Sequence, residues 1–227
     1  MNRGDFLWLG TLGAVSCIFL LPASHQIFVS VTRSHPYLMG FIKFAILATM
    51  GELLAIRISQ GAWKTPPGML YRAILWGLFG IIIVLMFEIF SSGVAGAVAK
   101  GLLATGDTSM EKLWVAFWIA TIMNLTFAPT FMTVHRITDT YVDYVCGEGR
   151  SLSDIKLKEV VASIDWQGIV SFVVLKTVPF FWIPAHTITF LLPPEYRILV
   201  AAYLSIALGA ILAYAKRRKL QTNLAVQ

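Results

Sequence analysis

The stretch Lys176–Arg197 reads KTVPFFWIPAHTITFLLPPEYR. It is strongly apolar before its charged end, yet its body holds one lysine, one histidine and two prolines: Lys176, His186, Pro179 and Pro184. Each proline removes a backbone N–H and its ring presses on the carbonyl one turn back, so a helix here is expected to bend or break. In a bilayer the freed carbonyls and both ionisable side chains need partners inside the protein. We therefore predict a bent membrane-spanning helix with an interior polar face.

The composition of the whole chain agrees with a membrane location. Of its 227 residues 57% are hydrophobic and 13% are charged, whereas soluble domains carry about 25% charged residues. The net charge of +6 does not indicate nucleic acid, because the basic residues lie in short connections between apolar runs. Cys17 and Cys146 are too isolated to form a disulfide framework or a metal site.

Apolar runs near the length needed to cross a bilayer divide the chain into six predicted spans. We expect one all-α domain, a polytopic membrane helical bundle over residues 1–227, with spans at about 6–31, 37–58, 69–90, 113–134, 168–192 and 198–215. A cleaved signal peptide is the competing interpretation of the first run. The run is long for that and has no Ala-x-Ala cleavage site, which favours a span.

Two segments lie outside these spans, and each has two possible structures. Residues 91–101 are rich in small side chains and too weakly apolar for a full span. We expect an interfacial or re-entrant piece there, with an extension of the third helix as the alternative. The polar connection 135–167 contains apolar positions at helical spacing after Ser153, a suitable N-cap. We predict a short amphipathic helix, lying on the membrane surface or packed on the ends of the spans.

The distribution of basic residues predicts the orientation of the chain. Six spans place both termini on one side, and that side then carries twelve of the eighteen Lys and Arg residues, against four on the other. Such a bias predicts that the termini face inside. A chain with no apparent eukaryotic targeting segment and this orientation is expected in a prokaryotic inner (plasma) membrane, as a multi-pass protein.

The last span contains a stripe of small residues at four-residue spacing: Ala201, Ser205, Gly209 and Ala213. Small side chains let another helix approach closely. We favour packing within the same chain over a homo-oligomer seam, which stays the alternative.

Ionisable and polar residues inside spans are the candidate functional residues, since a charge in mid-bilayer costs at least ~2.5–3.5 kcal/mol. Glu52 and Lys176 lie about 9 Å and about 12 Å from the inner ends of their spans at 1.5 Å per residue, so we expect them to pair. Lys43, Glu88 and His186 share a second level near the outer face. Snorkelling to the headgroups is the alternative for Lys43, Glu88 and Arg57.

We predict two polar layers inside the bundle. The polar-layer or pore-lining candidates are Lys43, Glu52, Glu88, Asn124, Lys176, Trp182, His186 and Thr189, and the helix-kink candidates are Pro129, Pro179 and Pro184. His186 is either a hydrogen-bonded core residue, which we favour, or a proton carrier. No phosphate-binding loop, dinucleotide fingerprint, zinc-protease motif or nucleophile elbow is present. We expect no catalysis, no cofactor and no metal.

The C-terminal part of the chain resembles the signature of the Mpv-seventeen and peroxisomal-membrane-protein (PMP, twenty-two kilodalton) family. The residues that carry the resemblance are Trp182-x-x-x-His186-x-x-Thr189-Phe190-x-x-Pro193-Pro194-x-x-Arg197. Looser matches are His35-Pro36 with Gly51-Glu52, Arg72 with Gly77-x-x-Gly80, and Met123-Asn124 with Ala128-Pro129. This chain departs from the family pattern at Glu52, His186 and Thr189, lacks its His-x-Trp-Tyr, and exceeds its usual count of about four spans.

The resemblance implies a prokaryotic family member with a pore-like role, without naming the solute. Together with the polar residues inside the spans, it leads us to expect a channel or pore for small solutes or ions. Two alternatives stay open. One is a substrate-binding membrane component that works with transporter subunits, and the other is a structural or assembly protein of the membrane without flux. The partners expected are the lipid bilayer and an unidentified small solute, and not nucleic acid.

Overall fold

A computed structural model describes residues 2–106 and 109–225 of the chain, and every element in these two ranges is helical. Five helices are long and apolar enough to cross a membrane, and a sixth crossing is counted if the bent pair at the start of the chain is one span. The predicted all-α fold is therefore confirmed, and the number of long apolar helices indicates a multi-pass membrane protein.

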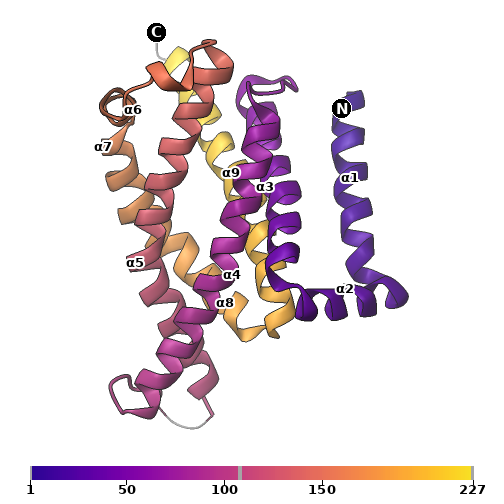
Figure 1. Cartoon of the computed structure of the whole chain (residues 1–227), viewed down its shortest axis with the longest axis vertical. Coiled ribbons are helices and arrows are strands. Elements are labelled where there is room, and N and C mark those ends of the chain that lie inside the picture. The colour runs from indigo at the N-terminus through magenta and orange to yellow at the C-terminus, as the bar shows by residue number, and fades with distance from the viewer. Residues whose placement is uncertain (1, 107–108, 226–227) are drawn as a thin grey trace.

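The first predicted span, residues 6–31, consists of two helices in the structure. Helix α1 (Arg3–Leu20) begins with a capping box, in which Asn2 and Asp5 each accept a hydrogen bond from the other's backbone N–H. Helix α2 (Pro22–Ser34) starts with Pro22, whose missing N–H and fixed φ suit a first turn. The two helices meet at 79°, so α2 runs sideways from the end of α1 to the start of α3 instead of continuing α1 (Figure 1).

Turn residues set the ends of the following helices. Helix α3 (Pro36–Gln60) starts at a proline and ends at Gly61, which adopts a positive φ of 75° as helix-terminating glycines do. Helix α4 (Met69–Ala99) continues through residues 91–99. This segment is an extension of the third span, so the interfacial or re-entrant piece that we favoured there is wrong.

The second half of the chain contains the longest helices and the least regular one. Helix α5 (Glu111–Val142) passes through Pro129 and ends in a π turn, η1 (Asp143–Gly147). After a 3-10 turn η2 (Leu152–Asp154) come α6 (Leu157–Ser163) and α7 (Trp166–Gly168). A π-helical segment η3 (Ile169–Trp182) then runs directly into α8 (Ile183–Leu191), and α9 (Pro194–Ala225) completes the chain.

The predicted amphipathic helix is shorter than expected and packs on protein. Its N-cap is Lys156, while Ser153 lies in the preceding 3-10 turn. Val160 is fully buried and Ile164 is nearly so, against the end of α5. This packing favours the second of the two alternatives, a helix seated on the ends of the spans.

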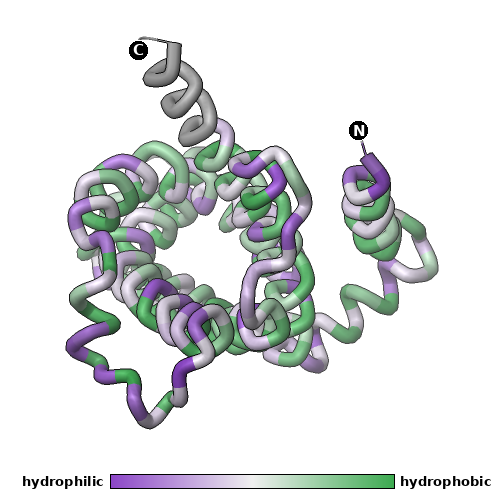
Figure 2. The backbone as a smooth tube through the Cα atoms, turned by 90° about the horizontal axis from the view of Figure 1, so that it is seen from above, coloured by the Kyte–Doolittle hydropathy of each residue, from purple (hydrophilic) through white to green (hydrophobic). Residues whose placement is uncertain are grey.

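The spanning helices stand side by side in a ring seen from above, with α1 outside it (Figure 2). Helix α3 packs most extensively against α4 and α9, and α5 packs against α8. Close backbone approaches explain the first two contacts: Gly40 of α3 meets Gly80 of α4, and Gly51 of α3 meets Ile206 and Gly209 of α9. The small-residue stripe Ala201, Ser205, Gly209 and Ala213 thus includes a residue that packs within the chain, as we favoured.

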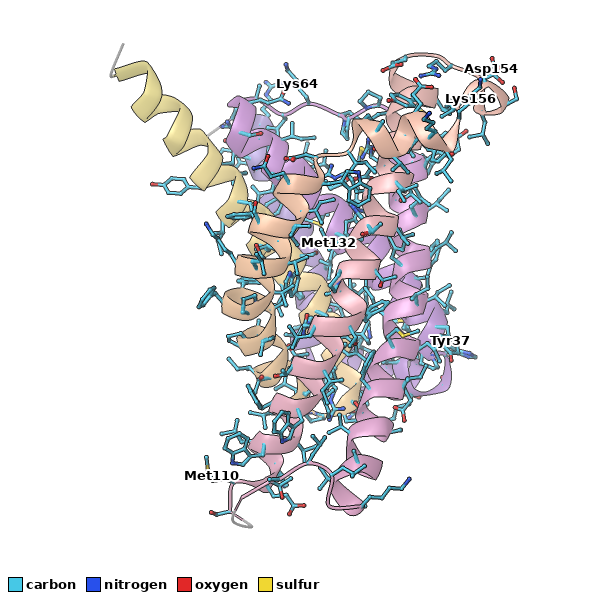
Figure 3. All side chains as sticks on the ribbon, turned by 90° about the vertical axis from the view of Figure 1, so that its left-hand side faces the viewer. Tyr37, Lys64, Met110, Met132, Asp154 and Lys156 are labelled. Carbon is cyan, nitrogen blue, oxygen red and sulfur yellow. The ribbon has the colours of Figure 1, made fainter. Side chains whose placement is uncertain are left out.

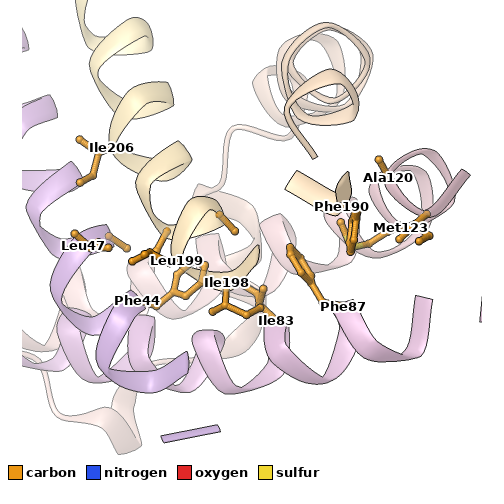
Figure 4. Packing of buried hydrophobic residues seen from close by; sticks show 14 of the residues in the cluster. Phe44, Leu47, Ile83, Phe87, Ala120, Met123, Phe190, Ile198, Leu199 and Ile206 are labelled. Carbon is orange, nitrogen blue, oxygen red and sulfur yellow. The ribbon is translucent and has the colours of Figure 1, made fainter. Parts of the chain in front are cut away.

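Apolar side chains from α3, α4, α5, α8 and α9 fill the centre of the bundle (Figure 4). Phe87 of α4 and Phe190 of α8 lie with their ring centroids 4.8 Å apart. Phe44, Leu199 and Ile83 continue the same cluster toward α3 and α9. Three groups of buried polar residues lie around this apolar core.

Figure 3 shows the two ends of the bundle. Lys64 and Lys156 lie at the end that also holds the start of α1 and the end of α9, and Met110 lies at the opposite end. We name these the terminal end and the hairpin end, after the α4–α5 connection. The side chains of the four C-terminal bases, Lys216, Arg217, Arg218 and Lys219, lie outside the described part of the structure.

Candidate functional site: polar groups inside the helix bundle

An ion-pair network joins α4 to α5 near the terminal end. The Arg72 guanidinium donates from Nη1 to Asp139 Oδ1 at 3.0 Å and from Nη2 to Asp143 Oδ1 at 2.6 Å. Its Nε donates to the Pro67 carbonyl oxygen at 3.2 Å, which ties in the α3–α4 connection. Arg72 and Asp139 are each only 8% exposed. A fork-shaped guanidinium is well suited to hold two carboxylates in fixed positions.

Glu52 of α3 belongs to the same region. One ligand-type atom each from Glu52, His135 and Asp139 lie within 4.8 Å of one another. His135 Nδ1 is 3.4 Å from Asp139 Oδ2, and its ring packs on Trp76 with centroids 4.4 Å apart. The terminal-end cluster, defined as Glu52, Arg72, His135, Asp139 and Asp143, therefore brings three helices and five titratable side chains together.

The predicted pair of Glu52 with Lys176 is wrong. Among the described residues Lys176 forms no ion pair, and its side chain is exposed beside Leu175. Within this turn of η3 the buried residues are Thr177 and Val178. Lys176 therefore does not lie on the inward face of the helix, although its predicted distance from the membrane surface was similar to that of Glu52.

Three members of the cluster have the atoms needed to hold a cation. Imidazole and carboxylate ligands suit several divalent metals. The Arg72 guanidinium, however, already neutralises Asp139 at 3.0 Å and would repel a metal ion placed beside it. The arrangement is therefore better described as a hydrogen-bonded charge network than as a preformed metal centre.

A second polar group lies in the middle of the bundle. Asn124 of α5 donates from Nδ2 to the Ala120 carbonyl oxygen at 2.7 Å, and the same nitrogen is 2.9 Å from His186 Nδ1. His186 Nδ1 also lies 3.2 Å from Asn124 Oδ1, so the imidazole and the amide form a side-chain pair in which the tautomer of His186 sets which group donates. The His186 ring also stacks on Trp182 at 5.0 Å and meets the edge of Phe87 at 5.6 Å.

Asn124, His186 and Thr189 were predicted to face the interior, and the structure places them there. Asn124 is 2% exposed and His186 is 8% exposed. Thr189 is fully buried, and its hydroxyl donates to the Ala185 carbonyl oxygen at 2.8 Å. His186 thus has the contacts of a hydrogen-bonded core residue, the interpretation that we favoured.

The two proline positions of this helix do not interrupt it. Pro179 lies within the π-helical segment and Pro184 lies in the first turn of α8. A π-helix bonds each N–H to the carbonyl five residues earlier, and such widened turns often occur at functional sites. The Thr177 hydroxyl follows the same spacing and donates to the Phe172 carbonyl oxygen at 3.2 Å. The helix is therefore continuous through both prolines with a change in hydrogen-bond pattern, so the break did not occur, and the bend stays a prediction.

A third polar group lies toward the hairpin end, around a cavity of about 380 Å³ between α2, α3, α4 and α9. We call it the Lys43 cavity. Lys43 and Glu88, predicted to share a level, both line it, together with Arg33, Glu195 and Arg197. His186 does not line it, because Phe87 stands between them and contacts His186 on its other side. Lys43 is 4% exposed, so it does not snorkel out of the bundle.

Several of these residues were not among the sequence candidates. The predicted connections contained His135, Asp139, Arg33 and Glu195, whereas Arg72 lay near the start of the predicted span 69–90 and was not proposed as a site residue. Helical spacing offered one usable signal, since His135 and Asp139 are four residues apart and meet on one face of a helix. No comparable local signal marks Arg33 and Glu195, which pair across α2 and α9.

Comparison of the chain with protein-family profiles, with curated proteins and with solved structures finds no match. The resemblance to the Mpv-seventeen and peroxisomal-membrane-protein family therefore stays a prediction, based on the residues quoted for it.

Proposed function

We propose that this chain is a membrane protein that lets small solutes or ions cross the bilayer, and not an enzyme. The observation that supports the proposal is the set of charged and polar side chains buried within apolar helices. Each such group costs several kcal/mol to place in hydrocarbon unless it is paired or wet. Intramembrane ionisable residues often mark the route of an ion or substrate for this reason.

The proposed route passes three groups of polar side chains. The Lys43 cavity lies toward the hairpin end, the Asn124–His186 pair in the middle, and Glu52 with His135 toward the terminal end. On α3 alone Lys43 and Glu52 are nine residues apart, or about 14 Å along the helix axis. Polar groups at such intervals let a solute exchange one set of partners for the next.

A flux assay tests this proposal. The purified chain is reconstituted into liposomes, and osmotic swelling in KCl, glycerol or small organic acids is followed by light scattering. We expect one of these solutes to enter faster than in empty liposomes, and we expect Glu52→Leu and His186→Leu to reduce its rate. Lys176→Leu is the matched control, because that lysine is exposed and outside the network. Flux that both interior variants leave unchanged would contradict the proposed route.

The Lys43 cavity also supports a second function, a solute-binding membrane component that works with other transporter subunits. Cavities of ~300–1,000 Å³ are the usual size of small-molecule sites. Stoichiometric binding of one small molecule by the purified chain, without flux in the liposome assay, would select this alternative over a channel.

A further inference from the structure

The charges around the Lys43 cavity are not evenly matched. Arg33 donates from Nε and Nη2 to the same Glu195 oxygen, so these two residues neutralise each other. Glu88 and Arg197 also line the cavity, so three cations, Arg33, Lys43 and Arg197, face two carboxylates. Lys43 is the remaining charge, and the ion pairs of the described residues do not include it.

Lys43 is also short of hydrogen-bond partners. Its Nζ donates to Thr32 Oγ1 at 3.2 Å and stands 4.6 Å from the centroid of the Phe28 ring. An ammonium has three donors, and a hydroxyl and a ring face do not supply a counter-charge. A buried cation without an anion is costly, so the cavity beside it is suited to an anionic group.

A second polar group beside the same cavity lacks a hydrogen-bond partner. Glu195 Oε2 is buried and has no hydrogen-bond partner, because both contacts from Arg33 go to Oε1. A carboxylate oxygen can only accept, so the group that satisfies it must carry an O–H or N–H. Val84, Leu85 and Ile198 make the rest of the wall partly apolar.

From these three features we infer that the Lys43 cavity binds a small organic oxyanion, a carboxylate or a phosphate, that also carries a hydrogen-bond donor. The oxyanion pairs with Lys43 Nζ and the donor reaches Glu195 Oε2. This inference names the solute class and so rests on the proposed function. The same chemistry is found in a free hydroxy or amino acid and in the headgroup of phosphatidylethanolamine.

Calorimetric titration of the full chain in a maltoside detergent, free of phospholipid, tests the soluble source. Lactate and propanoate are the probes, since they differ only in the hydroxyl donor. We expect lactate to bind more tightly, and Lys43→Met to weaken it about tenfold to a hundredfold, the size of a lost charged hydrogen bond. Lys176→Met is the control and leaves the affinity unchanged. Equal binding of both acids would overturn the role given to Glu195.

The lipid source is tested with nanodiscs of phosphatidylethanolamine and phosphatidylcholine, whose headgroups differ in the N–H donor. Native mass spectrometry of the released chain would show a retained phosphatidylethanolamine that Lys43→Met loses. That result assigns the cavity to a headgroup, and Lys43-dependent lactate binding assigns it to a solute. Absence of Lys43-dependent binding in both arms overturns the inference.

Two further measurements distinguish a loss of oxyanion binding from a folding defect and from a failure of the transport proposal. If Lys43→Met does not fold, the unmodified chain is tested instead. Lactate is then expected to raise its Tm more than propanoate does. Equal Tm values with the two acids, together with no retained phosphatidylethanolamine, overturn the inference. Binding without liposome flux rejects the transport proposal alone. Flux that persists in Lys43→Met without any oxyanion binding rejects the oxyanion inference alone.

Discussion

Arg72 connects more of the molecule than any other side chain of the terminal-end cluster. Its three donor groups reach the α3–α4 connection, the last turns of α5 and the π turn that follows. Asp139 is almost as buried as Arg72, whereas the Asp143 side chain is 59% exposed. The Arg72–Asp139 contact is therefore sheltered from water and the Arg72–Asp143 contact is not. Loss of the first is expected to cost more stability than loss of the second.

Replacing Arg72 leaves a buried carboxylate without its counter-charge. We expect Arg72→Leu to lower the free energy of unfolding by about 3–5 kcal/mol, measured by denaturing-detergent titration in mixed micelles. The double variant Arg72→Leu/Asp139→Leu is expected to recover much of the loss, because it removes the orphaned charge. Equal losses in the single and double variants would show that the pair contributes nothing as a unit.

The Arg150–Glu159 pair outside the spans gives a pH dependence. Arg150 donates to both oxygens of Glu159, at 2.5 Å and 2.9 Å, and this bonding holds the pKa of the Glu159 carboxyl below its usual value of 4.5. The stabilisation is therefore complete above the unfolded pKa and disappears as pH falls through the folded one. We expect the Tm difference between the natural chain and Glu159→Gln to shrink from pH 7 to pH 3. A difference that does not change with pH would contradict this assignment.

At the scale of helices, glycines decide how closely α3, α4 and α9 approach. A Cβ on Gly80 would collide with the Gly40 carbonyl oxygen, and a Cβ on Gly51 would lie 3.2 Å from Ile206 Cα. Backbone cannot move aside as a flexible side chain can. These two crossings hold α3 between its neighbours and thereby set where Lys43 and Glu52 face.

Two glycines of the same helix provide a matched test of this packing. Gly93 of α4 has nothing within 4 Å of its would-be Cβ, so Gly93→Ala should stabilise the chain by up to about 1 kcal/mol through helix propensity. Gly80→Ala meets backbone and should destabilise it by about 1–3 kcal/mol. Thermal unfolding in detergent compares the two variants. A stabilising Gly80→Ala would mean that α3 and α4 are farther apart than described.

The π-helical segment has an effect at the same scale. Its wider hydrogen-bond spacing changes which residues of η3 face inward, so Thr177 and Val178 are buried while Lys176 is exposed. The prolines explain why the α pattern is not kept here, since each lacks the N–H that an i to i−4 bond would need. The position of Lys176 along the predicted span does not reveal on which face of the helix its side chain lies.

At the scale of the whole molecule, the two ends differ in charge and in the buried groups near them. The terminal end holds Lys64 and Lys156 (Figure 3) and lies nearer the Glu52 cluster. The hairpin end lies nearer the Lys43 cavity. A solute crossing the bundle would therefore meet a net basic cavity near one side and a net acidic network near the other.

Cysteine labelling in sealed inverted and right-side-out vesicles tests the expected orientation. In a Cys17→Ser/Cys146→Ser background, Leu102→Cys marks the hairpin end, where Leu102 is 74% exposed, and Lys64→Cys marks the terminal end. With the termini inside, a membrane-impermeant maleimide should label Leu102→Cys in right-side-out vesicles and Lys64→Cys only in inverted ones. Labelling of both positions from one side would rule out an odd number of crossings between them.

Much of the fold was predictable because its signals are local. Apolar length predicts spans, and Pro36 and Gly61 mark the ends of α3 in the way their backbone preferences require. The interior position of Asn124, His186 and Thr189 was also predictable, since polar groups avoid hydrocarbon. The partners of Glu52 were not, because they come from three helices whose rotations no single segment determines.

The amino-acid sequence by itself therefore determined an all-helical chain built for a bilayer, with polar groups directed to its interior, because composition and hydrogen-bond satisfaction act on each helix separately. Only the tertiary structure decided which charges meet. The way the helices are rotated against one another placed Glu52 of α3 beside His135 of α5 and left Lys176 of η3 exposed. The same packing left Lys43 buried beside a cavity without a counter-charge, a consequence of long-range geometry that no stretch of sequence encodes alone.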